Sequence, residues 1–266
     1  MSKPIDPMAL ACADVEVRIG DKTLLADASV QLAAGRVTAI LGPNGAGKST
    51  LLSVLAGQRV PTQGRVMLDG RPLDAHGMPA LALRRALMPQ ESAVAFDFTA
   101  QEIVALGRYP HRRAPGRDED AIVEEAMSLT DVSALAPRIL NTLSGGEKAR
   151  AHMARALAQL WHPRPDGASR WLLLDEPTAA LDLAHQHSAM RLLRAWAARG
   201  VGVVAVLHDL NLARRYADEV VVLGGNAGLV QGPAAEVLEP ALIEAVWRTP
   251  CQPVTSADGT VQYLFG

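Results

Sequence analysis

Apolar and polar residues alternate in the first third of the chain as they do in half-buried strands. The alternation covers residues 15–19 and again residues 28–32, and it predicts two antiparallel strands because successive side chains of a strand point to opposite faces. An unbroken apolar run at residues 37–41 predicts a buried strand. Residues 64–68 form a further short strand pattern, followed by an Asp-Gly dipeptide typical of hairpin turns. We therefore expect this part of the chain to be rich in β-structure.

The pattern changes between residues 79 and 140. Thr99 and Glu102 have the spacing of a capping box, which predicts a helix that runs through Leu106. Residues 118–129 are rich in Glu and Ala and predict a second helix. We interpret this region as a helical insert.

From residue 144 onward, helix and strand patterns follow each other in turn. A helix is expected up to residue 160, a strand at residues 171–174, an amphipathic helix at residues 183–198 and a strand at residues 201–207. Alternation of this kind predicts βαβ units and a parallel sheet, and therefore an α/β fold.

Length and composition fit one globular domain with a small subdomain. The chain has 266 residues, 49% of them hydrophobic and 20% charged, and its net charge of −2 indicates no broad basic field that would hold nucleic acid. The apolar runs are too short for a membrane helix, and residues 1–12 lack a signal-peptide pattern, so we expect the chain to start in the cytoplasm. Two cysteines without a Cys/His cluster predict a reducing compartment and no structural zinc. We expect one domain over residues 1–266, with a core at about 1–88 and 144–266 and the helical insert at about 89–143.

Residues 42–49 read GPNGAGKS, which matches the P-loop spacing of Gly, four residues, Gly, Lys and then Ser or Thr. Glycines allow the backbone to aim several N–H groups at phosphate oxygens, and the helix that follows adds the positive end of its dipole. An ordinary glycine-rich turn is the alternative interpretation, which the preceding strand pattern disfavours. Lys48 is suited to reach the β and γ phosphates, and the Ser49 hydroxyl to bind Mg²⁺. The residues expected to hold a nucleotide are Gly42, Pro43, Asn44, Gly45, Ala46, Gly47, Lys48, Ser49 and Thr50.

Two adjacent carboxylates, Asp175 and Glu176, follow the apolar strand pattern at residues 171–174. Ligand sites in α/β sheets lie at the carboxyl ends of the strands. Asp175 is therefore suited to hold Mg²⁺ through water, and Glu176 to orient and deprotonate the water that attacks a γ-phosphate. A simple polar end to the strand is the alternative, and the P-loop upstream disfavours it.

Ser144 and Glu147 have capping-box spacing around two glycines, which predicts a helix N-terminus with bare N–H groups and thus a second anion-binding site. A chain with one P-loop needs such a site only if it serves a nucleotide held by another copy of the chain. The sequence LSGGE at residues 143–147 resembles the signature of the ATP-binding cassette (ABC) ATPases. In that family, two ATP molecules bind head to tail between the P-loop of one copy and the signature of the other.

The resemblance covers almost the whole chain, because Gln90 matches the Q-loop, residues 180–182 the D-loop and His208 the switch histidine, all in family order. It implies a P-loop ATPase core with a parallel sheet, an antiparallel β subdomain and a helical insert, and it implies ATP and Mg²⁺ as ligands. The implied site residues are, for catalysis, Glu176, His208 and Gln90; for the metal, Ser49, Asp175 and Gln90; and, for the nucleotide beside the P-loop, Ser144, Gly145, Gly146 and Asp182.

Two features depart from the family pattern. Glu147 stands where the signature usually ends in Gln, and we expect its carboxylate to cap the helix and to point away from phosphate. Residues 14–22 contain no aromatic side chain, where the family usually stacks one on adenine, and Arg18 or Ile19 is expected to take its place.

Within the family, the chain resembles the detached motor subunits of transporters. Residues 51–142, between P-loop and signature, lack the heptads of DNA-repair relatives, and only one cassette is present. Residues 104–113 and 171–187 resemble the ATPases of importers for haem, iron-siderophores and cobalamin, and most of all those of haemin importers. The motor of an exporter or lipid-extraction system and a soluble regulatory ABC module are the alternatives.

The resemblance implies a head-to-tail homodimer on the cytoplasmic face of the bacterial inner membrane, with two permease subunits and, indirectly, a periplasmic binding protein. The basic run at residues 108–113 is either part of the contact with the permease or an ordinary solvated loop. We do not expect His185 and His187 to bind haem, because residues i and i+2 of a helix do not face each other.

Overall fold

A six-stranded sheet forms the centre of the computed structural model, which describes residues 9–90, 96–224, 228–257 and 259–266. In spatial order its strands are β10 (Leu229–Pro233), β9 (Glu219–Leu223), β3 (Val37–Leu41), β8 (Val201–Val206), β7 (Arg170–Asp175) and β6 (Arg85–Met88). The strands run parallel except β10, which pairs antiparallel with β9 at the edge. The predicted parallel sheet is confirmed, and β3, β7 and β8 are completely buried, in keeping with their apolar sequences.

Strand β6 was not predicted. The helical character expected from residue 79 is wrong for Arg85–Met88, because these residues pair with β7 in the parallel sheet. Between β5 (Arg71–Pro72) and β6 the chain forms the 3₁₀ turn η1 (Leu73–Ala75) and the short helix α2 (Met78–Ala82). Four residues with alternating burial carry too little periodicity to separate a strand from a helix.

The expected antiparallel β subdomain is a four-stranded sheet in the order β2, β1, β4 and β5. These strands comprise Lys22–Ala33, Ala9–Ile19, Gln63–Leu68 and Arg71–Pro72, respectively. Val15, Val17 and Ala28 are buried, as the alternating pattern predicts. The turn between β4 and β5 has left-handed φ values of 48° at Asp69 and 72° at Gly70, as the hairpin turn predicted there requires.

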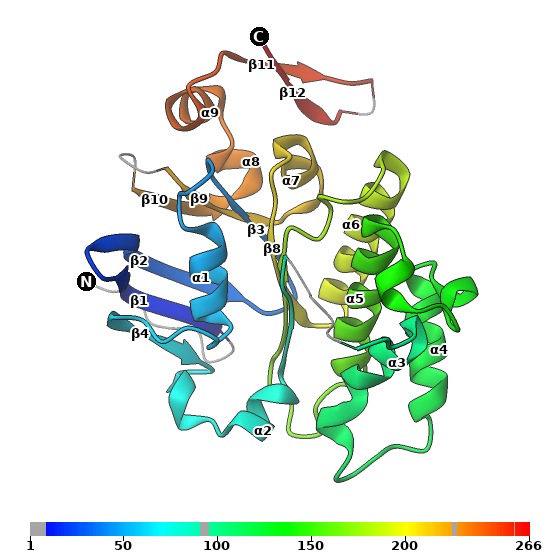
Figure 1. Ribbon diagram of the computed structural model, residues 1–266. Helices are drawn as coiled ribbons and strands as arrows, with labels where there is room; N and C mark the ends of the chain where they lie inside the picture. Colours follow the sequence, from blue (N-terminus) through cyan, green and yellow to red (C-terminus); the bar gives the residue numbers. More distant parts are fainter. Residues whose placement is uncertain (1–8, 91–95, 225–227, 258) are drawn as a thin grey trace.

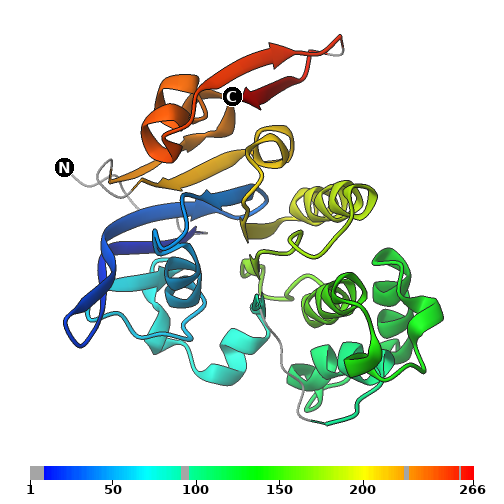
Figure 2. The ribbon, with the colours of Figure 1, turned by 45° about the horizontal axis from the view of Figure 1, so that its top comes forward.

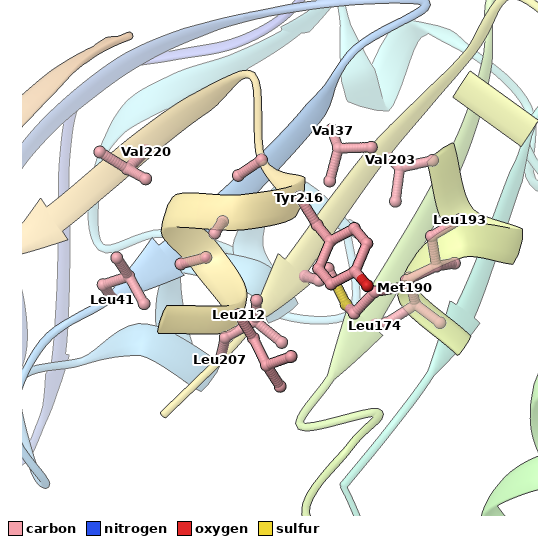
Figure 3. Close-up of a cluster of buried hydrophobic side chains, with 14 of the residues drawn as sticks. Val37, Leu41, Leu174, Met190, Leu193, Val203, Leu207, Leu212, Tyr216 and Val220 are labelled. Carbon is pink, nitrogen blue, oxygen red and sulfur yellow. The ribbon is translucent and has the colours of Figure 1, made fainter. Parts of the chain in front are cut away.

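Two buried clusters fill the space on either side of the central sheet. On one side, helix α1 (Lys48–Leu55) packs between the antiparallel sheet and strands β7 and β8, with its leucines buried. On the other side, helices α6 (Leu183–Ala198) and α7 (Leu210–Tyr216) cover the sheet, and Figure 3 shows Met190 and Leu193 of α6 beside the strands. This packing holds the carboxyl ends of the parallel strands together at one edge of the sheet.

The helical insert packs on the first long helix after it, α5 (Gly145–Gln159), and forms a separate buried cluster with it, drawn in green in Figure 1. Thr99 and Glu102 form the predicted capping box at the start of the insert. The elements of the insert are α3 (Ala100–Ala105), η2 (Leu106–His111), α4 (Glu119–Leu129), η3 (Ser133–Leu135) and η4 (Leu140–Thr142). Because α5 also packs on β6, it connects the insert to the central sheet.

Arg108 is not part of a solvated loop, which was one of the two expectations for the basic run. Its guanidinium donates hydrogen bonds to both carboxylate oxygens of Glu119, at 2.6 and 3.0 Å, and to the carbonyl oxygen of Ala158 at 2.6 Å. Only 8% of Arg108 is exposed, and its hydrogen bonds lower the pKa of Glu119 to about 2. Arg112 and Arg113, in contrast, are exposed. Arg108 therefore ties η2 to α4 and is not available to a partner.

The C-terminal elements lie beyond the edge of the central sheet and are drawn in orange and red in Figures 1 and 2. They are α8 (Ala234–Val237), α9 (Pro240–Trp247) and the hairpin of β11 (Cys251–Thr255) and β12 (Val261–Phe265). The hairpin is attached to α7, because the N–H of Tyr263 donates to Oδ1 of Asn211 at 2.7 Å. None of the described helices is long and apolar enough to cross a membrane.

Candidate functional site

The loop between β3 and α1 depends on two glycines. Gly42 has a φ of 148°, and a Cβ at this position would lie 2.4 Å from the carbonyl oxygen of Leu223. Gly47 has a φ of 96°, and a Cβ there would lie 2.7 Å from the carbonyl oxygen of Leu24. Any side chain would clash at either position, so the loop can lie against β2 and the end of β9 only with glycine.

Helix α1 begins with an N-terminus suited to an anion. Its N-cap is Gly47, so no side chain among the described residues caps the first turn. Bare N–H groups and the positive end of the helix dipole both favour a negative charge at this point. A phosphate group therefore fits the loop as the sequence analysis expected.

Lys48 lies folded back along this loop. Its Nζ donates hydrogen bonds to the carbonyl oxygens of Gly42 and Pro43, at 2.9 and 3.0 Å. Burial lowers the pKa of Lys48, while the nearby carboxylates of Glu176 and Asp175 act in the opposite direction. The ammonium group is thus held between the loop and these two carboxylates.

Ser49 and Asp175 are 126 residues apart in the chain and meet at the carboxyl end of β7. The Ser49 hydroxyl donates to Oδ1 of Asp175 at 3.0 Å. Burial raises the pKa of Asp175, and the hydrogen bond from Ser49 and the charge of Lys48 partly offset this effect. A carboxylate next to a hydroxyl offers two oxygen ligands of the kind that Mg²⁺ prefers, so the pair fits this metal.

Glu176 is oriented by two side chains from distant segments. His208 Nε2 donates to Oε1 of Glu176 at 2.6 Å, and Gln90 Nε2 donates to Oε2 at 3.0 Å. The contact with His208 requires a proton on Nε2, because an ionised carboxylate only accepts hydrogen bonds. Glu176 also has a φ of 52°, a strained value that persists where surrounding contacts determine the backbone. The carboxylate is therefore held in one direction.

The structure brings together most of the residues that the sequence analysis singled out. The side chains that meet are Gln90, Lys48, Ser49, Asp175, Glu176 and His208. The other predicted nucleotide contacts, Pro43, Asn44, Gly45, Ala46 and Thr50, belong to the same loop and the first turn of α1. Asn44 and Gly45 are exposed there.

Ser144, at the start of the signature, lies in a different part of the chain. It caps α5 by accepting a hydrogen bond from the N–H of Glu147 at 3.3 Å, while Oε2 of Glu147 accepts one from the N–H of Ser144 at 2.7 Å. The capping role expected for Glu147 is confirmed. Helix α1 packs on β1, β2, β7 and β8, whereas α5 packs on α3, α4 and β6, and Figures 1 and 2 show these two helices on separate sides of the strands.

The signature contacts the D-loop of the same chain. A Cβ on Gly146 would lie 2.9 Å from the carbonyl oxygen of Ala180, and Gly145 faces the same residue. Asp182 follows as the N-cap of α6, and its Oδ1 accepts a hydrogen bond from the N–H of His185 at 2.9 Å. The predicted signature and D-loop residues therefore form one contiguous region.

Sequence reasoning missed two residues beside this region, Asp131 and Arg150. Asp131 contacts His185, which is 54 residues away, and Arg150, which is 19 residues away. Neither contact leaves a local signal in the sequence, because it depends on how α4, α5 and α6 pack together.

For the adenine contact, Ile19 is 56% exposed at the end of β1, and Arg18 pairs with Glu16, so the expected role of either residue stays a prediction.

Relatives of known name cover nearly the whole chain. The family model described as ABC transporter matches residues 25–179. Hemin import ATP-binding protein HmuV of Gloeobacter violaceus is 48% identical over 236 residues, which is 88% of this chain and 86% of the relative. HmuV of Burkholderia pseudomallei is 47% identical over 260 residues, which is 91% of this chain and 94% of the relative.

Solved structures agree with this family in their fold. An inward-facing metal-chelate type ABC transporter aligns with a TM-score of 0.79 and 25% identity over 97% of both chains. The dimeric post-hydrolysis state of the ATP-binding cassette MJ0796, bound to ADP and Pi, aligns with a TM-score of 0.73 and 26% identity over 85% of this chain and 98% of that one. With the P-loop cradle and the carboxylates at the end of β7, these similarities show that the chain belongs to the ABC transporter family as one of its ATP-binding and ATP-hydrolysing subunits.

Proposed function

We propose that this chain powers the import of haem across the bacterial inner membrane. The observation that carries the proposal is the identity of 48% and 47% to two hemin import ATP-binding proteins over 88% and 91% of the chain. The chain would lie at the cytoplasmic face as a peripheral subunit, bound to two permease subunits and, through them, to a periplasmic binding protein. We treat residues 1–266 as one ABC ATPase domain, with the core at about 1–88 and 144–266 and the insert at about 89–143.

The geometry of the site supports a division of roles in ATP hydrolysis. The P-loop N–H groups and Lys48 would bind the β and γ phosphates. Ser49, Asp175 and the amide oxygen of Gln90 would hold Mg²⁺, which supplies positive charge to the phosphate oxygens when bound. Glu176 would orient the attacking water and accept its proton.

His208 and Gln90 would keep the Glu176 carboxylate in place for this step. Each donates a hydrogen bond to a different oxygen of Glu176, so rotation of the carboxylate would break at least one of the two. A base held in one orientation needs no rearrangement when the proton moves, and this lowers the barrier.

We propose that Ser144, Gly145, Gly146 and Asp182 complete the nucleotide pocket of a second copy in a head-to-tail homodimer. Two observations support this arrangement. The signature helix α5 and the P-loop helix α1 pack on separate parts of the chain, and the similar cassette MJ0796 is a dimer in its solved structures. In such a dimer, the N-terminus of α5, which is suited to bind an anion, would face the nucleotide held by the P-loop of the other copy.

The permease contact would lie on the exposed side of the helical insert. Tyr109 is 59% exposed, and the guanidinium of Arg112 stacks 3.8 Å from the centre of its ring. Leu106 is 46% exposed on the same segment. This segment and strand β6, which leads to Gln90, both pack on α5. A change at the nucleotide site can therefore reach the surface through α5, because Gln90 contacts Glu176.

Reversal of charge at two arginines of this segment should separate stability from transport. Arg112→Glu should lower transport by the complex with the permease. Basal ATP hydrolysis of the isolated subunit should stay unchanged, because Arg112 is exposed. Arg108→Glu should instead destabilise the fold by about 3 kcal/mol or more, because it breaks a buried ion pair and leaves Glu119 beside a like charge. Denaturant titration and transport assays measure the two effects. Equal loss of both activities in a well-folded Arg112→Glu variant would exclude this surface as the permease contact.

Reconstitution tests the proposed substrate. The chain is purified together with the permease that it binds and placed in proteoliposomes with the binding protein of that permease. We expect ATP-dependent uptake of haem, and no uptake in a matched complex that carries Glu176→Gln. Uptake of cobalamin or of a ferric siderophore in place of haem would refute the haem assignment and leave the importer role standing, whereas outward transport would refute both.

A further inference from the structure

His185 lies between two carboxylates that belong to different parts of the fold. Its Nδ1 is 2.8 Å from Oδ1 of Asp182, the N-cap of its own helix α6. Its Nε2 is 3.4 Å from Oδ2 of Asp131, which follows α4 in the helical insert. The ring therefore bridges the D-loop and the insert.

Asp131 is held in place by the signature helix α5. Nη1 of Arg150, a residue of α5, donates to Oδ2 of Asp131 at 2.8 Å and to its carbonyl oxygen at 2.5 Å. A cation at the C-terminal end of α4 is favourable, because the last carbonyl groups of a helix lack partners within it. Asp131 has a left-handed φ of 55° in this turn. Its position is thus set by α5 as well as by α4.

These contacts connect two regions that the proposed dimer would present to the opposite copy. Helix α5 starts at the signature with Ser144 as its N-cap, and α6 starts at the D-loop with Asp182 as its N-cap. In the first turn of α5, Gly146 lies against Ala180. Further along α5, Arg150 contacts Asp131, and Asp131 in turn contacts His185 of α6. Helix α4 packs beside α5, as Figure 1 shows, and His185 connects α6 to them through Asp131.

Apolar packing across the same junction is incomplete. A cavity of about 250 Å³ lies between α4, α5 and α6, and its apolar lining includes Leu129, Met153, Ala189 and Leu192. Asp131, Arg150 and His185 also line this cavity, so polar contacts bridge the helices where side chains leave a hollow. The Asp131 side chain is 84% exposed, and ion pairs this exposed add little to global stability. The contacts can therefore affect the orientation of the D-loop without determining whether the chain folds.

We propose that His185 is a positioning residue for ATP hydrolysis: it ties the D-loop to the signature helix of its own chain, so that both reach the nucleotide pocket of the opposite copy as one unit. The proposal rests on the head-to-tail dimer of the proposed function. Hydrogen bonds from His185 lower the pKa of Asp182 and of Asp131. His185 touches neither Glu176 nor the P-loop in any described contact and would act only through the D-loop.

Mixed transport complexes test this role. One copy carries Lys48→Ala, so only the pocket with the Lys48 of the other copy retains ATP. His185→Ala is placed either on the copy with the intact P-loop or on the Lys48→Ala copy, which supplies signature and D-loop to the working pocket. We measure how much ATP is retained and how fast it becomes ADP in a single turnover. We expect hydrolysis to slow about three- to tenfold only when His185→Ala is on the Lys48→Ala copy, with retention unchanged.

His187→Ala provides a matched control on the same helix. Nδ1 of His187 pairs with the hydroxyl of Tyr216 on α7, at 2.9 Å, and not with the insert, so we expect no change in either arrangement. Asp131→Asn should reproduce the slowing on the Lys48→Ala copy. Adding His185→Ala to the copy that already carries Asp131→Asn should slow hydrolysis no further, because both changes break the contact between His185 and Asp131.

Each other outcome overturns the proposal. Equal rates in the two arrangements, whether normal or slow, would mean that His185 has no role across the dimer, or only a structural role in its own chain. Additive slowing by Asp131→Asn and His185→Ala would mean that the two residues act separately. If the mixed complex with wild-type His185 retains no ATP, the head-to-tail dimer itself fails, and the role of His185 fails with it.

Discussion

ATP hydrolysis should fall by a factor of about 10² or more when Glu176 is replaced by Gln, while ATP binding stays nearly intact. The amide keeps the shape of the side chain and can still accept a hydrogen bond from His208 or Gln90, whose nitrogens lie 2.6 and 3.0 Å from the carboxylate oxygens. It cannot accept the proton of the attacking water. Phosphate release in the steady state measures the loss, and retention of labelled ATP measures binding.

Glu219→Gln is a suitable control for this substitution. Glu219 lies on β9 and pairs with Arg36 at 2.9 Å, so the variant changes the same type of side chain outside the proposed site. We expect its hydrolysis to be close to that of the wild type. Hydrolysis near the wild-type rate in Glu176→Gln itself would show that another group accepts the proton.

Two inactive variants should regain ATP retention when they are mixed. Lys48→Ala removes the ammonium group from the P-loop, and Ser144→Arg removes the cap of α5 and adds bulk at the signature. Each homodimer should retain no ATP. In the mixed dimer, one pocket contains both lesions, and the other pairs an intact Lys48 with an intact Ser144. In complexes purified as mixed dimers, retention should therefore recover to about half of the wild-type level, since one of two pockets is intact.

The same two lesions in another arrangement provide the control. A chain with both Lys48→Ala and Ser144→Arg, mixed with wild-type chain, gives a heterodimer in which each pocket has one lesion. This heterodimer should retain no ATP. If the first mixture does not recover retention although mixed dimers are present, and the control heterodimer does retain ATP, each chain builds its site alone, and the head-to-tail arrangement has to be abandoned.

Several features of the fold were readable from the sequence because they depend on near neighbours in the chain. The capping boxes at Thr99 and Ser144 require only a residue three positions later, and both are present. The strands with alternating or unbroken apolar residues appear as β1, β2 and β3. Strand β6 was missed, because its four residues owe their conformation to pairing with β7.

The burial of charged side chains could not be predicted from the sequence. Arg108 belongs to a basic run that predicts an exposed surface, yet it is buried against Glu119 and Ala158. Helix α4 has to pack beside η2 before this ion pair can form. Local composition carries no information on such packing.

By itself, the sequence determined which chemical groups are present and which local backbone conformation surrounds them. The P-loop is one example, since its glycines and the helix after it are adjacent in the chain. Only the tertiary structure decided which of these groups meet. Ser49 reaches Asp175 across 126 residues, Gln90 reaches Glu176 across 86, and His185 reaches Asp131 across 54. The reason is physical: the parallel sheet brings the carboxyl ends of distant strands to one edge, and helix packing joins α5 to α6, whereas sequence patterns report only on residues within a few turns or one strand.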